Sequence, residues 1–160
     1  MFNLTIQRAT LQDLQRICKF TDYWLAGRGL RFKAPGAVDD YFISPSQHKK
    51  YIEKYQTFMA HLAVNMIGWA VIQHDDSMIH FLIAGQYRRQ GYGKQFLDFL
   101  QPAKIHSKSN QSSGDPAGFY EHLGYEKTDT VKSRSRLDID KLRPDRKPII
   151  DIYEKIKCNG

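Results

Sequence analysis

Two arginines, followed closely by two glycines, stand between an apolar run and a segment of helical apolar spacing in the stretch IHFLIAGQYRRQGYGKQFLDFL, residues 79–100. The run predicts a strand, and the spacing that follows it predicts a helix. At a helix start, unpaired backbone N–H groups and the positive end of the helix dipole favour an anion, and glycine lets a ligand approach the backbone closely. Arg88 to Gly93 is therefore predicted to bind a phosphate.

The loop RRQGYGK differs from both common nucleotide-binding loops. It lacks the second glycine, lysine and hydroxyl of GxxxxGK[ST], and it does not contain GxGxxG. The net charge agrees with an anionic ligand, because 24 lysines and arginines against 17 acidic residues give a formal charge of +7. A phosphorylated cofactor, an acidic acceptor or a nucleic acid would each suit this charge.

The bulk composition predicts one soluble domain over residues 1–160. The chain is 41% hydrophobic and 26% charged, and it has no apolar run near the roughly 20 residues that a membrane helix needs. Its first residues lack a signal-peptide pattern, and Cys18 and Cys158 are the only cysteines, so we expect a cytoplasmic protein without membrane contact. The six histidines show no metal-ligand spacing, which predicts no metal site.

Apolar periodicity and capping residues predict the strands and helices that would position the loop. Three successive strands, 57–64, 69–74 and 78–84, predict an antiparallel meander with turns at 65–68 and 75–77. We expect helices to begin at Thr10, Ser44, Gly93 and Asp115, the last with Pro116 in its first turn and Gly124 as its stop. Further strands are expected over 4–8, 103–107 and 149–156. This order predicts an α/β (α+β) domain with a mixed sheet.

Three motifs in order resemble the GNAT superfamily of N-acetyltransferases. Arg88 to Gly93 resembles its [QR]-x-x-G-x-[GA] pyrophosphate loop, GFYEHLGY at 118–125 resembles its later motif, and IQRATLQDLQRI at 6–17 resembles its first strand and helix. The resemblance covers nearly the whole chain. It implies a GNAT-like mixed central β-sheet with helices on both faces, and a loop that follows a strand splayed from its neighbour.

The resemblance implies acetyl-CoA (coenzyme A) as co-substrate, with its diphosphate held mainly by backbone amides. Arg88, Arg89 and Lys94 would support the phosphates, although neighbouring charges can also form a solvated surface cluster. The family often has an asparagine where Ser113 stands. The implied cofactor-binding residues are Leu82, Ile83, Arg88, Arg89, Gln90, Gly91, Tyr92, Gly93, Lys94 and Ser113.

Acetyl transfer to an amine needs a base and benefits from an acid. A lysine-like amine, with a pKa near 10.4, must lose a proton before it attacks, and the departing thiolate accepts one. The resemblance places Tyr120 beside the cofactor sulfur, and a phenol holds its proton at neutral pH, so Tyr120 is the expected acid. The alternative is a tyrosine that only packs on a helix face.

His80 is the candidate base. Many family members have a glutamate on the strand before the loop, whereas 78–84 contains no carboxylate, and histidine titrates in the useful pH range. Strand alternation predicts that His80 shares a face with Met78 and Leu82. A structural histidine is the alternative, and Asp75, Glu121 or a chain of waters remain possible bases.

Tyr23 and Trp24, at the end of the first expected helix, are candidates for an acceptor pocket or for the core. The predicted function is acetyl transfer to a primary amine of an unidentified acceptor, by direct attack in a ternary complex. We expect a small-molecule or protein amine as acceptor and a monomer or homodimer. The basic stretch 132–147 leaves open acylation of an amine on nucleic acid, such as aminoacyl-tRNA, or a non-catalytic module that binds coenzyme A or nucleic acid.

Overall fold

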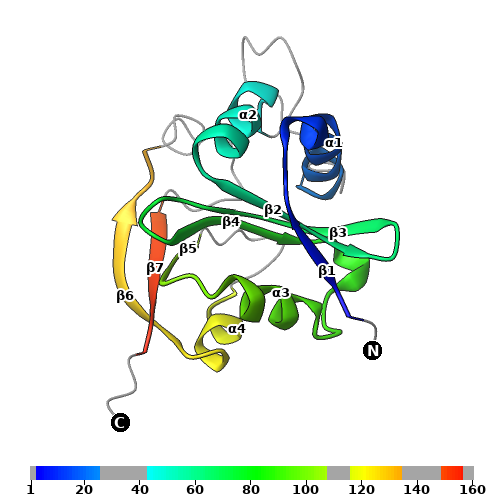
Figure 1. Ribbon diagram of the computed structural model, residues 1–160. Helices are drawn as coiled ribbons and strands as arrows, with labels where there is room; N and C mark the ends of the chain where they lie inside the picture. Colours follow the sequence, from blue (N-terminus) through cyan, green and yellow to red (C-terminus); the bar gives the residue numbers. More distant parts are fainter. Residues whose placement is uncertain (1–2, 26–42, 108–115, 135–148, 157–160) are drawn as a thin grey trace.

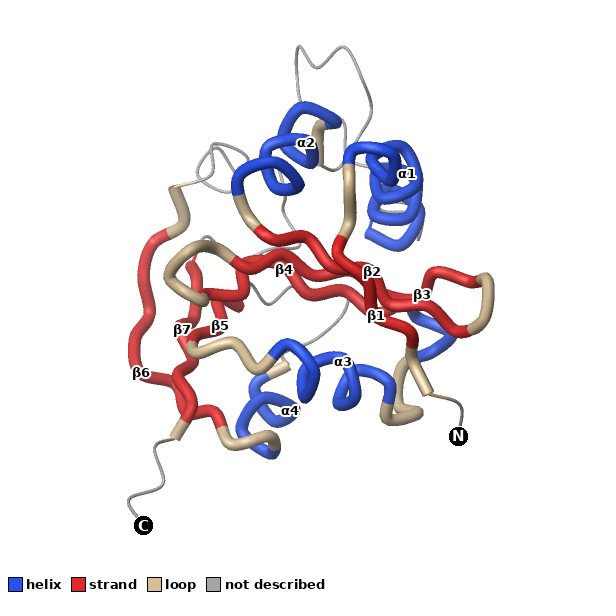
Figure 2. Tube along the Cα trace, viewed as in Figure 1, coloured by secondary structure: helices blue, strands red, loops and turns tan. Residues whose placement is uncertain are grey.

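Two layers of helices enclose a seven-stranded β-sheet in the computed structural model, which describes residues 3–25, 43–107, 116–134 and 149–156. Helices α1 (Leu14–Leu25) and α2 (Pro45–Lys54) cover one face (Figure 1). Helices α3 (Tyr92–Leu100) and α4 (Ala117–His122) cover the other (Figure 2). The predicted mixed sheet with helices on both faces is confirmed as an α+β fold.

The strand order is β1-β2-β3-β4-β5-β7-β6. Only β4 and β5 pair in parallel among the described strands, and the other neighbours are antiparallel, so the expected meander of β2, β3 and β4 is confirmed. The strands are β1 (Thr5–Arg8), β2 (Gln56–Leu62), β3 (Asn65–Ile72), β4 (Ser77–Ile83), β5 (Lys104–Ser107), β6 (Tyr125–Lys132) and β7 (Ile149–Lys155).

Two of the helix starts follow the capping chemistry expected from the sequence, and the start of α4 differs. Thr10 precedes the short 3₁₀ helix η1 (Leu11–Asp13), and its backbone N–H donates to the Asp13 carboxylate at 2.9 Å. At α2, the Ser44 hydroxyl accepts from the backbone N–H of Gln47 at 3.2 Å. Pro116 takes the N-cap position of α4 rather than its first turn, and Asp115 lies outside the described residues.

The turn between β2 and β3 differs from the prediction. It lies at Ala63 and Val64 rather than at 65–68, and Asn65 already pairs with Leu62. Gly68 serves packing instead, because a Cβ there would lie 2.8 Å from the Ile83 side chain. Turn-forming residue types predicted the wrong position, since the glycine is needed inside the sheet rather than at its end.

Each face of the sheet has its own hydrophobic core. Ile17, Phe20 and Trp69 belong to the cluster beneath α1 and α2. Phe96 and Tyr120 belong to the cluster beneath α3 and α4. The cluster to which a β4 side chain belongs therefore reports which face it points to.

Candidate functional site

β4 separates from β5 part-way along its length. The parallel pairing between described residues joins Ser77 to Lys104 and Met78 to Ile105, while β4 continues to Ile83 against β3. Because the Ala84 N–H bonds to β3, alternation turns the backbone groups of Ile83 toward the open side. The splay implied by the family resemblance is therefore present, and it starts after Met78.

A β-bulge falls at the residue where the splay begins. His80 pairs with Val71 and Met78 with Ile72, which leaves Ile79 as the extra residue of β4. The expectation that His80 shares a face with Met78 was wrong for this reason. Met78 belongs to the α3 and α4 side, whereas Ile79 packs on the α1 and α2 side, where His80 also contacts Trp69.

The loop after β4 contains two residues with left-handed backbone conformation. The 3₁₀ helix η2 (Gly85–Tyr87) leads into a turn in which Arg89 has φ 62° and Gly91 has φ 87°. The first-turn N–H groups of any helix lack an intrahelical acceptor, and Gly91, the N-cap of α3, has no side chain to supply one. The N–H groups at this end of α3 can donate hydrogen bonds to an anionic oxygen.

The polar side chains of the loop mostly bind the protein itself. Arg88 donates from Nε to the Ile83 carbonyl at 2.9 Å, and Gln90 donates to the Gln86 carbonyl at 2.9 Å. Lys94 bonds Asp98 at 2.8 Å, with both side chains more than half exposed. Arg88 therefore fastens the loop to the end of β4, and backbone N–H groups are left as the main candidates for phosphate contact.

Several residues predicted to bind the cofactor have side chains that are buried in the core. Leu82 and Ile83 are buried in opposite cores, and the Tyr92 ring is buried near Tyr87. Their backbone atoms alone remain candidates for cofactor contact. Arg89 is exposed, as are Gln90 and Gly91, and Ser113 lies outside the described residues.

Phe119 forms an apolar wall beside the loop. A Cβ on Gly93 would lie 3.3 Å from the Phe119 ring and 3.8 Å from the Ile83 side chain. The same ring stacks on Phe81 of β4 with 6.4 Å between centroids and is 36% exposed. Glycine at 93 thus keeps the start of α3 close to an aromatic surface. The sequence motif contained Phe119, but we had not predicted it as a site residue.

Tyr120 is buried on the α3 and α4 side of the sheet. Its ring lies 5.4 Å from that of Tyr153 on β7. Burial raises the pKa of Tyr120 above its ordinary value, and Tyr153 raises it further. The phenol is therefore protonated throughout the physiological range.

His80 lies on the opposite face in a cluster of aromatic rings. Its Nε2 is 3.0 Å from the Tyr51 hydroxyl on α2, and its ring stacks on Trp69 at 5.1 Å and 27°. His48 packs edge-on against the same Trp69 at 5.3 Å. The sequence analysis did not connect Tyr51 with His80.

Burial keeps His48 neutral. It is 1% exposed, and neither ring nitrogen has a hydrogen-bond partner within the described part of the chain. Desolvation lowers the pKa of His48 to about 4. This imidazole is uncharged at neutral pH and lies one ring away from His80.

The other candidate bases are less well placed. Asp75 accepts from the Ser77 N–H at 3.1 Å in the turn before β4. Burial raises the pKa of this carboxyl, but the bonds from Ser77 outweigh burial and lower it. Glu121 is exposed on α4, on the other side of the sheet from His80.

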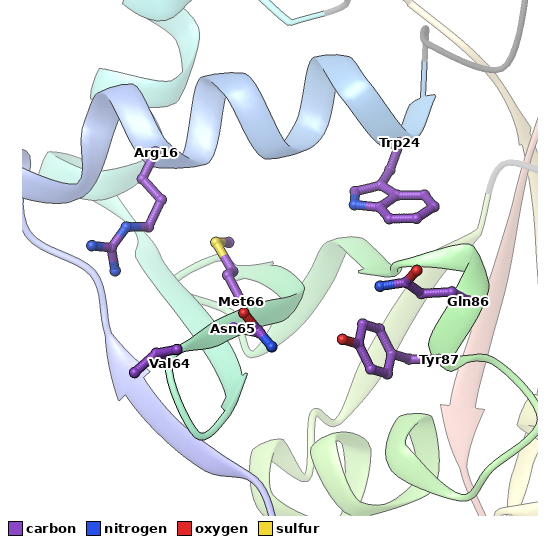
Figure 3. A pocket seen from close by; sticks show the side chains of 7 residues that line it. All are labelled: Arg16, Trp24, Val64, Asn65, Met66, Gln86 and Tyr87. Atoms are coloured by element: carbon purple, nitrogen blue, oxygen red, sulfur yellow. The ribbon is translucent and has the colours of Figure 1, made fainter.

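A pocket of about 430 Å³ lies between α1, the β2–β3 turn and η2 (Figure 3). Trp24 lines it and also packs against the core beneath α1 and α2, whereas Tyr23 is 64% exposed and packs edge-on against Trp24. Acceptor contact by either residue stays a prediction. The other lining residues were not predicted. The lining residues are Arg16, Trp24, Val64, Asn65, Met66, Gln86 and Tyr87.

This pocket is distant from His80. It contains Met66 of β3, whereas His80 pairs with Val71, five residues farther along the same strand. At about 3.3 Å per residue, the separation along the strand is roughly 16 Å. The predicted base, His80, therefore lies apart from the pocket that Trp24 lines.

The basic stretch, possible metal ligands and possible membrane helices can be examined only in the described residues. Of the basic stretch 132–147, residues 135–147 lie outside the described part. The described residues contain no group of three potential metal ligands. No helix within the described ranges is long and apolar enough to cross a membrane.

Comparison with known proteins agrees with this geometry. The alanine N-acetyltransferase of ribosomal protein S18 from Escherichia coli has 18% identity and a TM-score of 0.59, with 98% of this chain and 96% of that chain covered. A GNAT family acetyltransferase from Elizabethkingia anophelis, solved with acetyl-CoA bound, has 14% identity and a TM-score of 0.56, with 98% and 100% covered. An IAA acetyltransferase from Bacillus cereus has 14% identity and a TM-score of 0.60, with 96% and 100% covered. These structures share the fold.

Comparison of the sequence with curated proteins gives no significant match. The family model described as an acetyltransferase (GNAT) domain matches residues 33–139, which is more than half of the chain. That range includes the β4 splay, the predicted phosphate-binding loop 88–93 and α4. The chain belongs to the GNAT family of acetyltransferases.

Proposed function

We propose that this protein transfers an acetyl group from acetyl-CoA to a primary amine by direct attack in a ternary complex. In this proposal His80 removes the proton from the amine and Tyr120 donates one toward the departing sulfur. The observation that carries the proposal is the position of the splay. It opens the sheet beside His80 and continues to the loop that precedes α3.

The described residues fit a ligand with a phosphorylated head and an apolar arm. The first-turn N–H groups of α3 would hold phosphate oxygens, with the exposed Arg89 in support. Phe119 supplies an apolar surface beside Gly93, and the open edge of β4 near Phe81 supplies backbone donors and acceptors. Acetyl-CoA bound there supplies a thioester, which is an acyl group with a good leaving group.

His80 would act on the amine from the α1 and α2 side. The imidazole is half-buried and is held by Tyr51 and Trp69 in one orientation. A base must be in place before attack because an ordinary alkylamine is protonated at neutral pH. The bulge residue Ile79 lies outside the regular β3–β4 ladder, which leaves its backbone N–H as a candidate to stabilise the developing oxyanion.

Tyr120 would act from the other face, mainly through a hydrogen bond. Its raised pKa means that the proton is still present when negative charge develops on sulfur. A cysteine-like thiolate has a pKa near 8.5, so complete transfer from such a weak acid is unfavourable. Tyr120 can instead stabilise the thiolate through a charge-assisted O–H···S hydrogen bond, in which the phenol keeps its proton.

The separation of His80 from the Trp24 pocket constrains the acceptor. A small amine that reaches His80 cannot also contact a pocket roughly 16 Å away along β3. We propose that the reacting amine lies on the His80 side, so that Tyr23 and Trp24 contact only a longer acceptor such as a peptide. Among the structural neighbours, one is named for acetylating an alanine of a ribosomal protein and another for acetylating spermidine.

The test is consumption of acetyl-CoA with a panel of acceptors of graded length, from short amines to amino-terminal peptides. We expect turnover with at least one primary amine, and Trp24→Ala is expected to raise KM for long acceptors only. Acetyl-CoA that neither binds nor is consumed with any acceptor would refute the proposal.

A further inference from the structure

We propose that Tyr51 is a positioning residue that fixes the tautomer of His80. This inference rests on the proposed role of His80 as base. Its starting point is the 3.0 Å contact between the Tyr51 hydroxyl on α2 and His80 Nε2 on β4. The two residues are 29 positions apart in the sequence, so the fold creates the pair.

A neutral imidazole carries one N–H and one lone pair. If Nε2 holds the hydrogen and donates it to the Tyr51 oxygen, Nδ1 carries the lone pair and can take a proton. If instead Tyr51 donates to Nε2, Nδ1 carries the hydrogen and cannot act as a base. Catalysis by His80 therefore requires the Nε2–H tautomer, with the Tyr51 oxygen as acceptor.

The ring packing limits the orientation of both partners. Trp69 stacks beneath His80 at 27°, and Tyr55 stacks on Tyr51 at 6.1 Å and 23°. Tyr51 is 9% exposed. Neither ring can turn far without losing this packing, so the hydroxyl is held at Nε2. A nucleophile or base oriented by a third group is a common arrangement in enzymes, and Tyr51 would be that third group.

Other titratable groups on the described elements pack near His80. On α2, His48 is kept neutral by burial and lies behind Trp69. On β5, His106 alternates with the core residue Ile105 and so points to the His80 face, where burial also lowers its pKa. Asp75 and Lys104 interact with His106.

The proton balance is simple. The amine gives its proton to Nδ1 of His80, the ring becomes an imidazolium, and its Nε2–H continues to donate to the Tyr51 oxygen. That hydrogen bond is stronger to the cation than to the neutral ring, so Tyr51 makes His80 a stronger base. Tyr51→Phe removes the oxygen while keeping the ring that packs on Tyr55 and His80.

The first experiment is a nitrogen NMR titration of the imidazoles in the full chain, without any acceptor. His80→Gln identifies the His80 signals. We expect the Nε2–H tautomer in the parent protein, and in Tyr51→Phe a mixture of tautomers and a titration midpoint at lower pH. Tyr55→Phe, which removes a neighbouring hydroxyl, is the control and should leave both unchanged. The Nδ1–H tautomer in the parent, or no change in Tyr51→Phe, would overturn the inference.

The second experiment separates this inference from the proposed function. With an acceptor found by the panel, we expect kcat of Tyr51→Phe to fall by about 10-fold, with KM for acetyl-CoA unchanged and the acidic limb of the pH profile moved to lower pH. Full activity of His80→Gln would refute the proposed base itself. Loss of activity in His80→Gln with an unmoved pH profile in Tyr51→Phe would refute only the role of Tyr51.

Discussion

His80 and Tyr120 lie on opposite faces of the sheet. His80 contacts α2 through Tyr51, whereas Tyr120 packs in the core beneath α3 and α4. In a continuous sheet, the backbone of the strands would separate these two side chains. The proposed pair of acid and base is feasible only because β4 and β5 part after Met78, which lets one ligand meet both faces.

Tyr120→Phe is expected to lower kcat by roughly 10- to 1,000-fold while leaving acetyl-CoA affinity nearly unchanged. The variant loses one hydroxyl and keeps the buried ring. Steady-state rates and the thermal shift with acetyl-CoA measure the two effects. Tyr153→Phe, which alters the ring in contact with Tyr120, is the control. Activity within twofold of the parent, when chemistry limits the rate, would exclude Tyr120 as an essential donor.

Gly91→Ala should weaken acetyl-CoA binding and lower stability by about 1 kcal/mol, because φ 87° is unfavourable for a residue with a Cβ. Thermal unfolding with and without acetyl-CoA measures both effects. Gly118→Ala on α4 is a matched control, since its Cβ would meet nothing within 4 Å. Equal cofactor shifts in the two variants would contradict the assignment of the loop.

Gly68→Ala should destabilise the fold by about 1–3 kcal/mol, because the added Cβ lies 2.8 Å from Ile83 Cδ1 and 3.2 Å from the Leu82 carbonyl. The backbone oxygen cannot move aside as a flexible side chain can. Denaturant unfolding measures the loss, and Gly118→Ala again serves as the control. An unchanged midpoint would show that β3 and β4 can separate without cost.

Acid should destabilise the protein through His48. Its folded pKa, about 4, lies below the ordinary 6.5, so the unfolded chain binds a proton that the folded chain does not. The contribution of neutral His48 to the free energy of unfolding is therefore fully present above pH 6.5 and is lost as pH falls toward 4, by up to about 3 kcal/mol. Unfolding free energies for the parent and for His48→Phe test this. His48→Phe should flatten the decline, whereas His122→Gln on the exposed end of α4 should not.

Local sequence signals predicted much of the fold and the backbone elements that carry the candidate site. The caps at Thr10 and Ser44 are local hydrogen bonds between neighbouring residues, and so they were predictable from residue type. The face of His80 was not predictable, because the bulge at Ile79 depends on how β4 pairs with β3. The contact between Tyr51 and His80 joins a helix to a distant strand, and periodicity alone gives no such pairing.

The open edge of β4 also bears on how the protein avoids aggregation. Unpaired strand groups are a template for another chain, and here they lie inside a sheet rather than at its border. At the end of this edge, Arg88 Nε already donates a hydrogen bond to the Ile83 carbonyl. A bound ligand along the remainder would act as a temporary neighbouring strand. We therefore expect acetyl-CoA to suppress self-association on mild heating, measured by light scattering, and Arg88→Gln to increase it.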